Sequence, residues 1–466
     1  MRKYIPYILL AVFFFAACKK EPDVIIVHEH IRAHVMMSFG FNNLSSALTE
    51  DINDMTKGYV PGNTEYDNYL FVFSHRAAGY YNEPTSPVLE RFYRDAEGKV
   101  VREKLKTFEP GTVPNKGEVI KEVLEFLRDS YPDIESYGVL MSSHGTGWAP
   151  PGYCSDPSSF EGSSLDDDEW LFSRPGRRTE HGLTLPSYCG EGYGSLSGDY
   201  PYQPVPDVKS FGATVTGTNP TTSYETDIKD LAAAIPFRLD YLVFDACFMG
   251  GVEVAYELKD KCRYLCASQT EILSDGMDYF TLCEDLLKNE EPDMAGLADN
   301  YYRHYNEASG SKRSATISVI DCAKLDVLAA VCRNIFRRYD IDASNVQSSC
   351  LQKYYYYSFH AWFYDLYSIV EAAGRKRLDS LSSGEEGTVT DEYAMAEEQL
   401  EVDLADLQWA LDACVLYKAA TPTFALYGFP IRTHSGLSMY LPDLNRTWLN
   451  SYYSTLSWNE VSGLVK

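Results

Sequence analysis

Two residues with reactive side chains, His144 and Cys247, each follow a short apolar run. The run 137–143 leads to His144 and Gly145, and the run 239–246 leads to Cys247. A thiol has a resting pKa of about 8.5, so it needs a proton acceptor to act as a nucleophile near neutral pH. An imidazole within hydrogen-bond reach takes that proton and later gives it to a departing amine. The two residues therefore predict covalent acyl transfer by a Cys–His dyad.

Backbone N–H groups beside this dyad could hold the negative oxygen of a tetrahedral intermediate. Gly145 has no side chain, so its N–H can be approached closely, and the N–H of Cys247 is the second candidate for an oxyanion hole. No Asp or Asn that would orient His144 is identifiable, so a dyad is the working hypothesis. Taken alone, each residue has an ordinary explanation, a buried cysteine or a chance His-Gly pair. Other histidines are also present, among them His75, His181, His304, His360 and His434.

The apolar runs that precede these residues belong to an alternating pattern of strands and helices. Strands are predicted over 32–38, 69–74, 137–143, 240–247, 264–269 and 315–320, and helices over 47–57, 116–129, 226–235 and 250–259. This alternation is typical of an α/β fold with a mostly parallel sheet covered on both faces. Adjacent parallel strands end at the same edge of a sheet, so we expect His144 and Cys247 to come together there.

The rest of the chain adds a loop insertion and a helical region to this domain, which we expect over 32–466. Residues 149–208 are rich in Pro, Gly, Ser and Asp, and this insertion is too long for a bare connector. A helical region at about 322–420 is predicted as helices over 322–340, 345–376 and 391–418, with a polar break from Gly374 to Thr388. A closing strand is expected over 436–442 and a short helix over 446–456. Ser45 or Ser46 is the expected cap of the helix 47–57.

The N-terminus predicts export and lipid anchoring. Arg2 and Lys3 precede an apolar run, Ile5–Phe15, which is too short for the roughly 20 residues of a membrane-spanning helix. Small residues then precede Cys18, as in the bacterial lipobox, where the signal (here 1–17) is removed and the cysteine is lipidated. A plain secretory signal is the alternative. Residues 18–31 would be the lipidated cysteine and its tether, and the protein would sit in the bacterial cell envelope, on the outer membrane, facing either the periplasm or the outside.

Charge and cysteine content limit the partners. The chain has 41 Lys+Arg and 67 Asp+Glu, a net charge of −26, which argues against nucleic acid and anionic lipid surfaces as partners. The cysteines show neither a disulfide framework nor zinc-ligand spacing, so free buried thiols are expected, although Cys154 and Cys189 could pair. We interpret the acidic run Asp166–Glu169 as a solvated charge run, with a Ca²⁺ site as the alternative. No metal or other cofactor is required by the predicted chemistry.

The chain resembles the clostripain family of cysteine peptidases, which share the caspase-like fold. The resemblance rests on two blocks, Ser143–Trp148 and Asp245–Gly250. Further matches are Asn42–Leu44, Ala267–Glu271, Gly276–Tyr279 and Ser435–Pro442. The resemblance implies that His144 and Cys247 are the dyad and that the enzyme cuts protein or peptide substrates after exposed Arg or Lys residues.

The same resemblance implies an acidic specificity pocket for the basic side chain. Asp245 matches the acid at the base of that pocket, and a buried carboxylate favours a guanidinium or ammonium over uncharged side chains. A second acid is expected after the next strand, where Asp275 and Asp278 are the candidates and we favour Asp275. A structural turn or helix cap is the alternative for Asp278.

The chain departs from the family pattern in two places. The dyad residues are 247 − 144 = 103 positions apart, which is long for the family because of the insertion 149–208. Some relatives cut themselves between the two blocks, and this stretch holds basic residues at Arg174, Arg177, Arg178 and Lys209. We hypothesise that cleavage there releases an occluding loop. Ser143 also stands where an acidic residue is common.

Two other functions are compatible with parts of the sequence. One is a non-catalytic, envelope-anchored lipoprotein that captures peptide or glycan, for which the 36 tyrosines and the long helices would be suitable. The other is a peptidase-like fold that has lost its activity, and the presence of both His144 and Cys247 argues against it.

Overall fold

The computed structural model describes residues 28–40, 42, 44–64, 66–78, 83–154, 157–161, 214–215, 223–354, 362–382, 390–426 and 428–466. The residues on which lipidation, calcium binding and processing were predicted lie outside this part of the chain: Cys18, Asp166–Glu169, Arg174, Arg177, Arg178 and Lys209. None of the helices in the described part combines the length and apolar character needed to span a bilayer.

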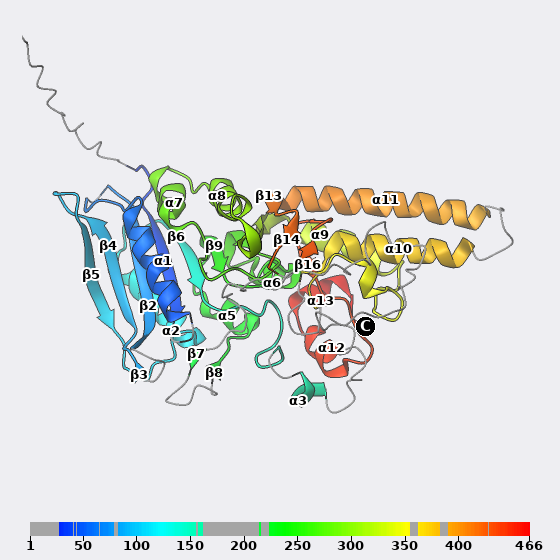
Figure 1. Ribbon diagram of the computed structural model, residues 1–466, viewed down its shortest axis with the longest axis horizontal. Coiled ribbons are helices and arrows are strands. Elements are labelled where there is room, and N and C mark those ends of the chain that lie inside the picture. The colour runs from blue at the N-terminus through cyan, green and yellow to red at the C-terminus, as the bar shows by residue number, and fades with distance from the viewer. Residues whose placement is uncertain are drawn as a thin grey trace, which may run out of the picture.

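A large mixed sheet forms the centre of the molecule, with the strand order β13-β11-β10-β9-β6-β1-β2-β4-β5 (Figure 1). Neighbouring strands from β2 through β1, β6 and β9 to β10 are parallel, and antiparallel strands extend the sheet on both sides. The strands are β1 (Arg32–Gly40), β2 (Tyr69–Ala78), β4 (Val88–Arg94), β5 (Val100–Thr107), β6 (Ser136–Ser142), β9 (Leu239–Asp245), β10 (Cys262–Ala267), β11 (Thr316–Asp321) and β13 (Val415–Ala420), and β3 (Glu83–Pro84) pairs with β2. The predicted mostly parallel α/β sheet is confirmed.

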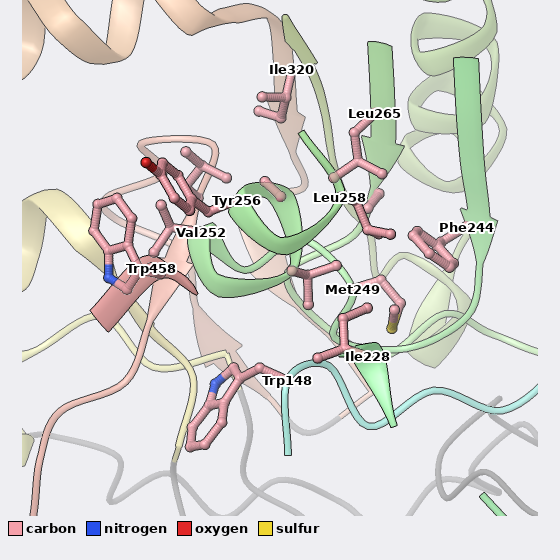
Figure 2. Close-up of a cluster of buried hydrophobic side chains, with 14 of the residues drawn as sticks. Trp148, Ile228, Phe244, Met249, Val252, Tyr256, Leu258, Leu265, Ile320 and Trp458 are labelled. Carbon is pink, nitrogen blue, oxygen red and sulfur yellow. The ribbon is translucent and has the colours of Figure 1, made fainter. Parts of the chain in front are cut away.

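Helices cover both faces of this sheet, because successive strand residues point to opposite sides. Val139 of β6 belongs to one hydrophobic cluster and Leu140 to the other. The first cluster, part of which is shown in Figure 2, is completed by α2 (Gly117–Ser130), α5 (Ile228–Ala234), α6 (Val252–Leu258), α9 (Leu325–Phe336), α10 (Leu366–Ser382), α11 (Asp391–Cys414), α12 (Thr447–Tyr453) and α13 (Ser457–Ser462). The second is completed by α1 (Ser45–Lys57), α7 (Tyr279–Cys283), a π-helical turn (Glu284–Lys288) and α8 (Met294–Asn306).

Short elements complete the described structure. Two-residue strands pair as β7 (Thr214–Val215) with β8 (Ser223–Tyr224), β12 (Tyr364–Asp365) with β16 (Ser438–Met439), and β14 (Thr423–Phe424) with β15 (Phe429–Pro430). Helix α3 spans Ser158–Glu161, and 3₁₀ turns lie at Gly310–Lys312, Cys322–Lys324 and Ser348–Cys350.

The C-terminal predictions were partly wrong. The helix expected over 345–376 begins only at Leu366, and the one expected over 391–418 ends at Cys414. The following residues form β13, the outermost strand, because they pair with β11. The expected closing strand 436–442 is reduced to β16, which lies outside the large sheet.

The helix pair α10–α11 also replaces a predicted break. Helix α10 continues through Gly374 to Ser382, and in Figure 1 it runs beside α11 away from the sheet. A Cβ atom on Gly374 would lie 2.1 Å from Cδ1 of Leu400 in α11, so the missing side chain allows the two helices to pack closely. Glycine here serves helix packing and does not end the helix.

The predicted serine cap of α1 was wrong as well. The capping position is Leu44, which has no side chain able to bond the helix terminus. Instead, Oδ1 of Asn42 accepts the N–H of Leu44 at 2.9 Å, and its Nδ2 donates to the carbonyl of Phe39 at 3.0 Å. Asn42 therefore organises the turn from β1 into α1.

The cysteines mostly behave as expected. In the part of the chain that the structure describes, the free and buried thiols are Cys154, Cys247, Cys262, Cys266, Cys283, Cys322, Cys332 and Cys414. A disulfide between Cys154 and Cys189 is therefore wrong. Cys350 is disulfide-bonded, so the expectation of free thiols fails at this position.

Candidate active site

The strand ends that carry His144 and Cys247 meet at one edge of the sheet. Strands β6 and β9 are parallel neighbours, and Ser142 lies opposite Asp245 at their carboxyl ends. His144 and Cys247 each lie two residues beyond this pair. The convergence expected from the sequence is therefore observed, although β9 ends at Asp245 and not at Cys247 as predicted.

Two glycines bring the segment after β6 directly against the segment after β9. A Cβ atom on Gly145 would lie 2.4 Å from the carbonyl oxygen of Cys247 and 3.0 Å from its nitrogen. A Cβ atom on Gly147, whose φ is +62°, would lie 2.8 Å from the carbonyl oxygen of Phe248. Side chains cannot be accommodated at such distances, so glycine is required at both positions. The backbone that follows His144 thus contacts the backbone of Cys247 itself.

A sharp turn follows Cys247. Phe248 has φ of 62° and is the one residue other than glycine with a positive φ in the described part of the chain. This conformation costs on the order of 1–3 kcal/mol and persists only where the surroundings enforce it. The N–H of Phe248 donates to the carbonyl of Thr270 at 3.0 Å, and the N–H of Gly250 donates to that of Ser268 at 2.7 Å. These two bonds hold the turn against the segment after β10.

The sulfur of Cys247 is covered in this arrangement. The residue is 0% exposed, and the N–H of Ile272 donates to Sγ at 3.2 Å. The carbonyl oxygen of Ile272 lies 3.8 Å from the same sulfur. A substrate carbonyl can reach the thiol only after the Ile272 segment has moved. His144 is half-buried, and it lines a pocket of about 90 Å³ that we call the His144 pocket, together with Met141, Gly145, Phe244, Leu231 and neighbouring residues.

Asp245 is a buried carboxylate with fixed hydrogen-bond donors. It is 0% exposed, and its Oδ2 accepts the hydroxyl of Ser142 at 2.7 Å and that of Tyr279 at 2.6 Å. Burial, followed by the charge of Asp245, raises the pKa of Tyr279 well above its ordinary value, so the phenol remains a donor. Sequence reasoning identified Asp245 but missed both partners. The only signal for them was a serine within an apolar strand and the Tyr that ends the block Gly276–Tyr279.

The two other candidate acids differ in their surroundings. The side chain of Asp275 is 43% exposed and forms an ion pair with Nζ of Lys312 at 2.7 Å. Asp278 stands at the N-terminal cap of α7 without making a side-chain cap bond. It directly precedes Tyr279, whose hydroxyl reaches Asp245.

A further buried carboxylate, Glu253, was not anticipated. It lies in α6, just after the Cys247 turn, and is 0% exposed. Its Oε1 accepts the N–H of Tyr440 and the hydroxyl of Tyr453, both at 2.8 Å. Burial raises the pKa of Glu253 to about 7. The side chain therefore joins α6 to the C-terminal segment. The sole signal in the sequence was an acidic residue within an apolar helical stretch.

Within the described residues, no cluster of three or more His, Cys, Asp or Glu side chains is arranged to hold a metal ion.

Comparison with solved structures shows which known folds this one resembles. The fold is similar to that of an inactive zymogen of a C11 protease from Parabacteroides distasonis, with a TM-score of 0.64, 23% identity and coverage of 94% of this chain and 99% of that one. It is also similar to iotapain, a secreted C11 cysteine protease from Bacteroides thetaiotaomicron, with a TM-score of 0.63, 23% identity and coverage of 93% and 99%. A secreted C11 cysteine protease from B. thetaiotaomicron in complex with an irreversible peptide inhibitor gives a TM-score of 0.60 at 21% identity, again covering 93% and 99%.

The sequence comparison assigns the family itself. The model of the clostripain family matches residues 221–462, which is more than half of the chain. No curated protein sequence matches the chain. The chain belongs to the clostripain family and is a cysteine peptidase with a caspase-like fold.

Proposed function

We propose that the protein is an endopeptidase that cuts after Arg or Lys, with Cys247 as nucleophile and His144 as general base and acid. The observation that carries this proposal is the direct contact between the two strand-end segments, in which Gly145 lies against the backbone of Cys247. A thiol and an imidazole on touching segments are the minimum needed for acyl transfer.

The reaction would run in two steps. His144 takes the thiol proton as the sulfur of Cys247 attacks the scissile carbonyl, and the N–H groups of Gly145 and Cys247 hold the resulting oxyanion. Collapse of this intermediate breaks the C–N bond, and His144 gives its proton to the leaving amine. Water, deprotonated by His144, then attacks the thioester, which releases the acid and regenerates the thiol.

Basic specificity would rest on Asp245. The hydroxyls of Ser142 and Tyr279 fix one of its oxygens, so the carboxylate is held in place before substrate arrives. A desolvated pair between a carboxylate and a guanidinium or ammonium discriminates strongly against neutral side chains. Asp275 is the second proposed acid, and it would exchange Lys312 for the cation of the substrate. Asp278 would act only through its neighbour Tyr279.

Activation would require uncovering the sulfur. The N–H of Ile272 donates to Sγ of Cys247, and the residue is buried. A covered nucleophile is what a latent enzyme would have. The similar P. distasonis protein is described as an inactive zymogen. Cleavage at Arg174, Arg177, Arg178 or Lys209, within the insertion 149–208 or just after it, is our proposed trigger. Mass spectrometry of the mature protein tests it, and an uncut chain with full activity would remove the idea.

The proposed location follows from the N-terminal sequence. Cleavage after residue 17 and lipidation of Cys18 would anchor the enzyme to the bacterial cell envelope, with residues 18–31 as tether and 32–466 as peptidase domain. Radiolabelled palmitate incorporation that is lost in Cys18→Ala tests the anchor. Calcium dependence, proposed only for Asp166–Glu169, is tested by activity in the presence of a chelator.

Fluorogenic peptides test the activity itself. Substrates with Arg, Lys, Asp or Ala before the reporter are offered to the wild type, before and after limited trypsin treatment, and to Cys247→Ala. We expect turnover of the Arg and Lys substrates by the wild type alone. Absence of turnover in every form of the wild type would favour a binding protein or an inactive peptidase-like fold.

A further inference from the structure

The His144 pocket lies on the opposite face of the sheet from Asp245. Its wall is formed by Met141 and Phe244 at the ends of β6 and β9 and by Ile120 and Leu231 from α2 and α5. These four residues belong to the first hydrophobic cluster, whereas Tyr279, which bonds Asp245, belongs to the second. Phe244 and Asp245 are consecutive strand residues, so their side chains point to opposite faces.

The proposed mechanism determines which substrate residue lies beside Asp245 and which lies beside His144. In the proposed mechanism, the basic side chain before the cleaved bond reaches Asp245. His144 gives its proton to the leaving amine, so the residue after the cleaved bond must start beside the imidazole. The His144 pocket is lined by that same residue and by Gly145.

We propose that the His144 pocket is the subsite for the side chain directly after the cleaved bond (P1′), and that it selects an aliphatic residue. This inference rests on the proposed function and adds a second specificity to it.

The chemistry of the pocket supports an aliphatic occupant. Figure 2 shows the side chains of Ile228, Phe244 and Met249 near one another beneath the strand ends, and all three line the pocket. Its volume of about 90 Å³ is smaller than the cavity of about 150 Å³ that holds benzene in another protein. Leu, Ile, Val or Met should therefore fit, and Trp should not.

An acid at the pocket also excludes acidic residues. Glu225 lines it, and its carboxylate accepts the N–H of Gly152 at 2.7 Å. Burial raises the pKa of Glu225. An Asp or Glu side chain of a substrate would lie beside this carboxyl group, and its charge would lose hydration there.

Internally quenched peptides with Arg before the cleaved bond test the inference. The P1′ residue is Leu, Gly, Asp or Trp, and all other positions are constant. For the active wild type we expect kcat/KM for Leu to exceed that for Gly about tenfold, since burial of one aliphatic side chain is worth at least that factor. Asp and Trp should fall below Gly.

Variants of Leu231 connect this preference to the pocket. Leu231→Phe fills the space and should reduce the Leu/Gly ratio toward one, whereas Leu231→Ala enlarges it and should raise turnover of the Trp peptide relative to the Leu peptide. Ala233→Phe is the matched control, because Ala233 lies on the exposed side of the same helix. It should keep the wild-type ratios.

The outcomes separate this inference from the proposed function. The quenched peptide with Gly after Arg has no P1′ side chain, so failure to hydrolyse it contradicts the proposed peptidase activity. If it is hydrolysed but the P1′ series is flat, or if Leu231→Phe alters selectivity only for the residue before Arg (P2), the pocket is not the P1′ subsite.

Discussion

The two faces of the sheet at its active edge are built in opposite ways. On one face, Asp245 is enclosed and its Oδ2 accepts hydrogen bonds from Ser142 and Tyr279. On the other face, the adjacent residue Phe244 borders a pocket of about 90 Å³ that is apolar over most of its wall. Recognition of charge requires donors fixed in advance, and recognition of an aliphatic side chain requires space. One residue step along β9 separates the two.

The buried carboxylate and the pocket each lower the stability of the folded protein. A buried carboxylate loses its hydration and is tolerated only when its bonds are replaced. An apolar hollow forfeits packing contacts, at about 24 cal/mol for each Å³ of cavity in another protein. Stability is therefore given up on both sides of the same strand end, as is common where a site must accept a ligand.

The largest expected effect on activity comes from replacing Cys247, which follows the strand end where the two faces meet. Cys247→Ala removes the proposed nucleophile and should reduce kcat at least 10³-fold, as removal of a catalytic nucleophile does elsewhere. Hydrolysis of an Arg-aminomethylcoumarin substrate measures it. Cys266→Ala, at another buried thiol in the neighbouring strand β10, is the matched control and should retain activity. Equal activity of Cys247→Ala and the wild type would show that another residue attacks the bond.

The next largest effect is on the preference for Arg, and it comes from the face of the sheet that carries Asp245. Asp245→Asn keeps the shape of the side chain but removes its charge, and it should lower kcat/KM for Arg substrates about 100-fold, within the range for a broken buried charge pair. A norleucine substrate has no charge to lose, so the Arg/norleucine ratio should fall by a similar factor. A ratio that stays at the wild-type value would place the basic specificity elsewhere.

A second buried carboxylate lies on the face of the sheet opposite to Asp245. Glu253 belongs to α6, which packs in the first cluster, and burial raises its pKa from 4.5 to about 7. Between these values the folded state retains a proton that the unfolded chain releases, so the free energy of unfolding should decrease as pH rises through this window and level off above it. The contribution is on the order of 3 kcal/mol.

Glu253→Gln should remove this part of the pH dependence. Urea unfolding at pH 5 and pH 8 measures it, and the variant should gain stability relative to the wild type between the two values. Glu257→Gln, at a half-buried position of the same helix, is the control. An unchanged difference between wild type and Glu253→Gln at the two pH values would show that Glu253 does not titrate in this window.

The smallest effect should come from one hydroxyl on the polar face. Tyr279→Phe removes a hydrogen bond to Asp245 and should raise KM for Arg substrates about tenfold, the lower end of the range for a hydrogen bond to a charged group. Tyr256→Phe, whose hydroxyl bonds Asp326 at 2.8 Å, should leave KM unchanged. A larger loss in kcat than in KM would assign Tyr279 a role beyond holding the carboxylate.

The core of the sheet and the pair His144 and Cys247 could be predicted because they depend on local pattern. The apolar runs before both residues leave little choice but buried parallel strands, and their ends must share an edge. Tertiary contacts decided the rest. Gly374 continues a helix because Leu400 packs against it, and 415–420 form a strand because β11 offers an edge. Tyr279 and Glu253 escaped notice because their partners are distant in sequence.

The most direct test is labelling with a peptide acyloxymethyl ketone that ends in Arg, applied to the trypsin-activated wild type and followed by peptide mapping. We predict a single adduct on Cys247, formed much more slowly in Asp245→Asn and absent in Cys247→Ala. An adduct on a different cysteine, or labelling of Cys247 at the same rate without the charge of Asp245, would contradict the arrangement of nucleophile and specificity acid at this strand end.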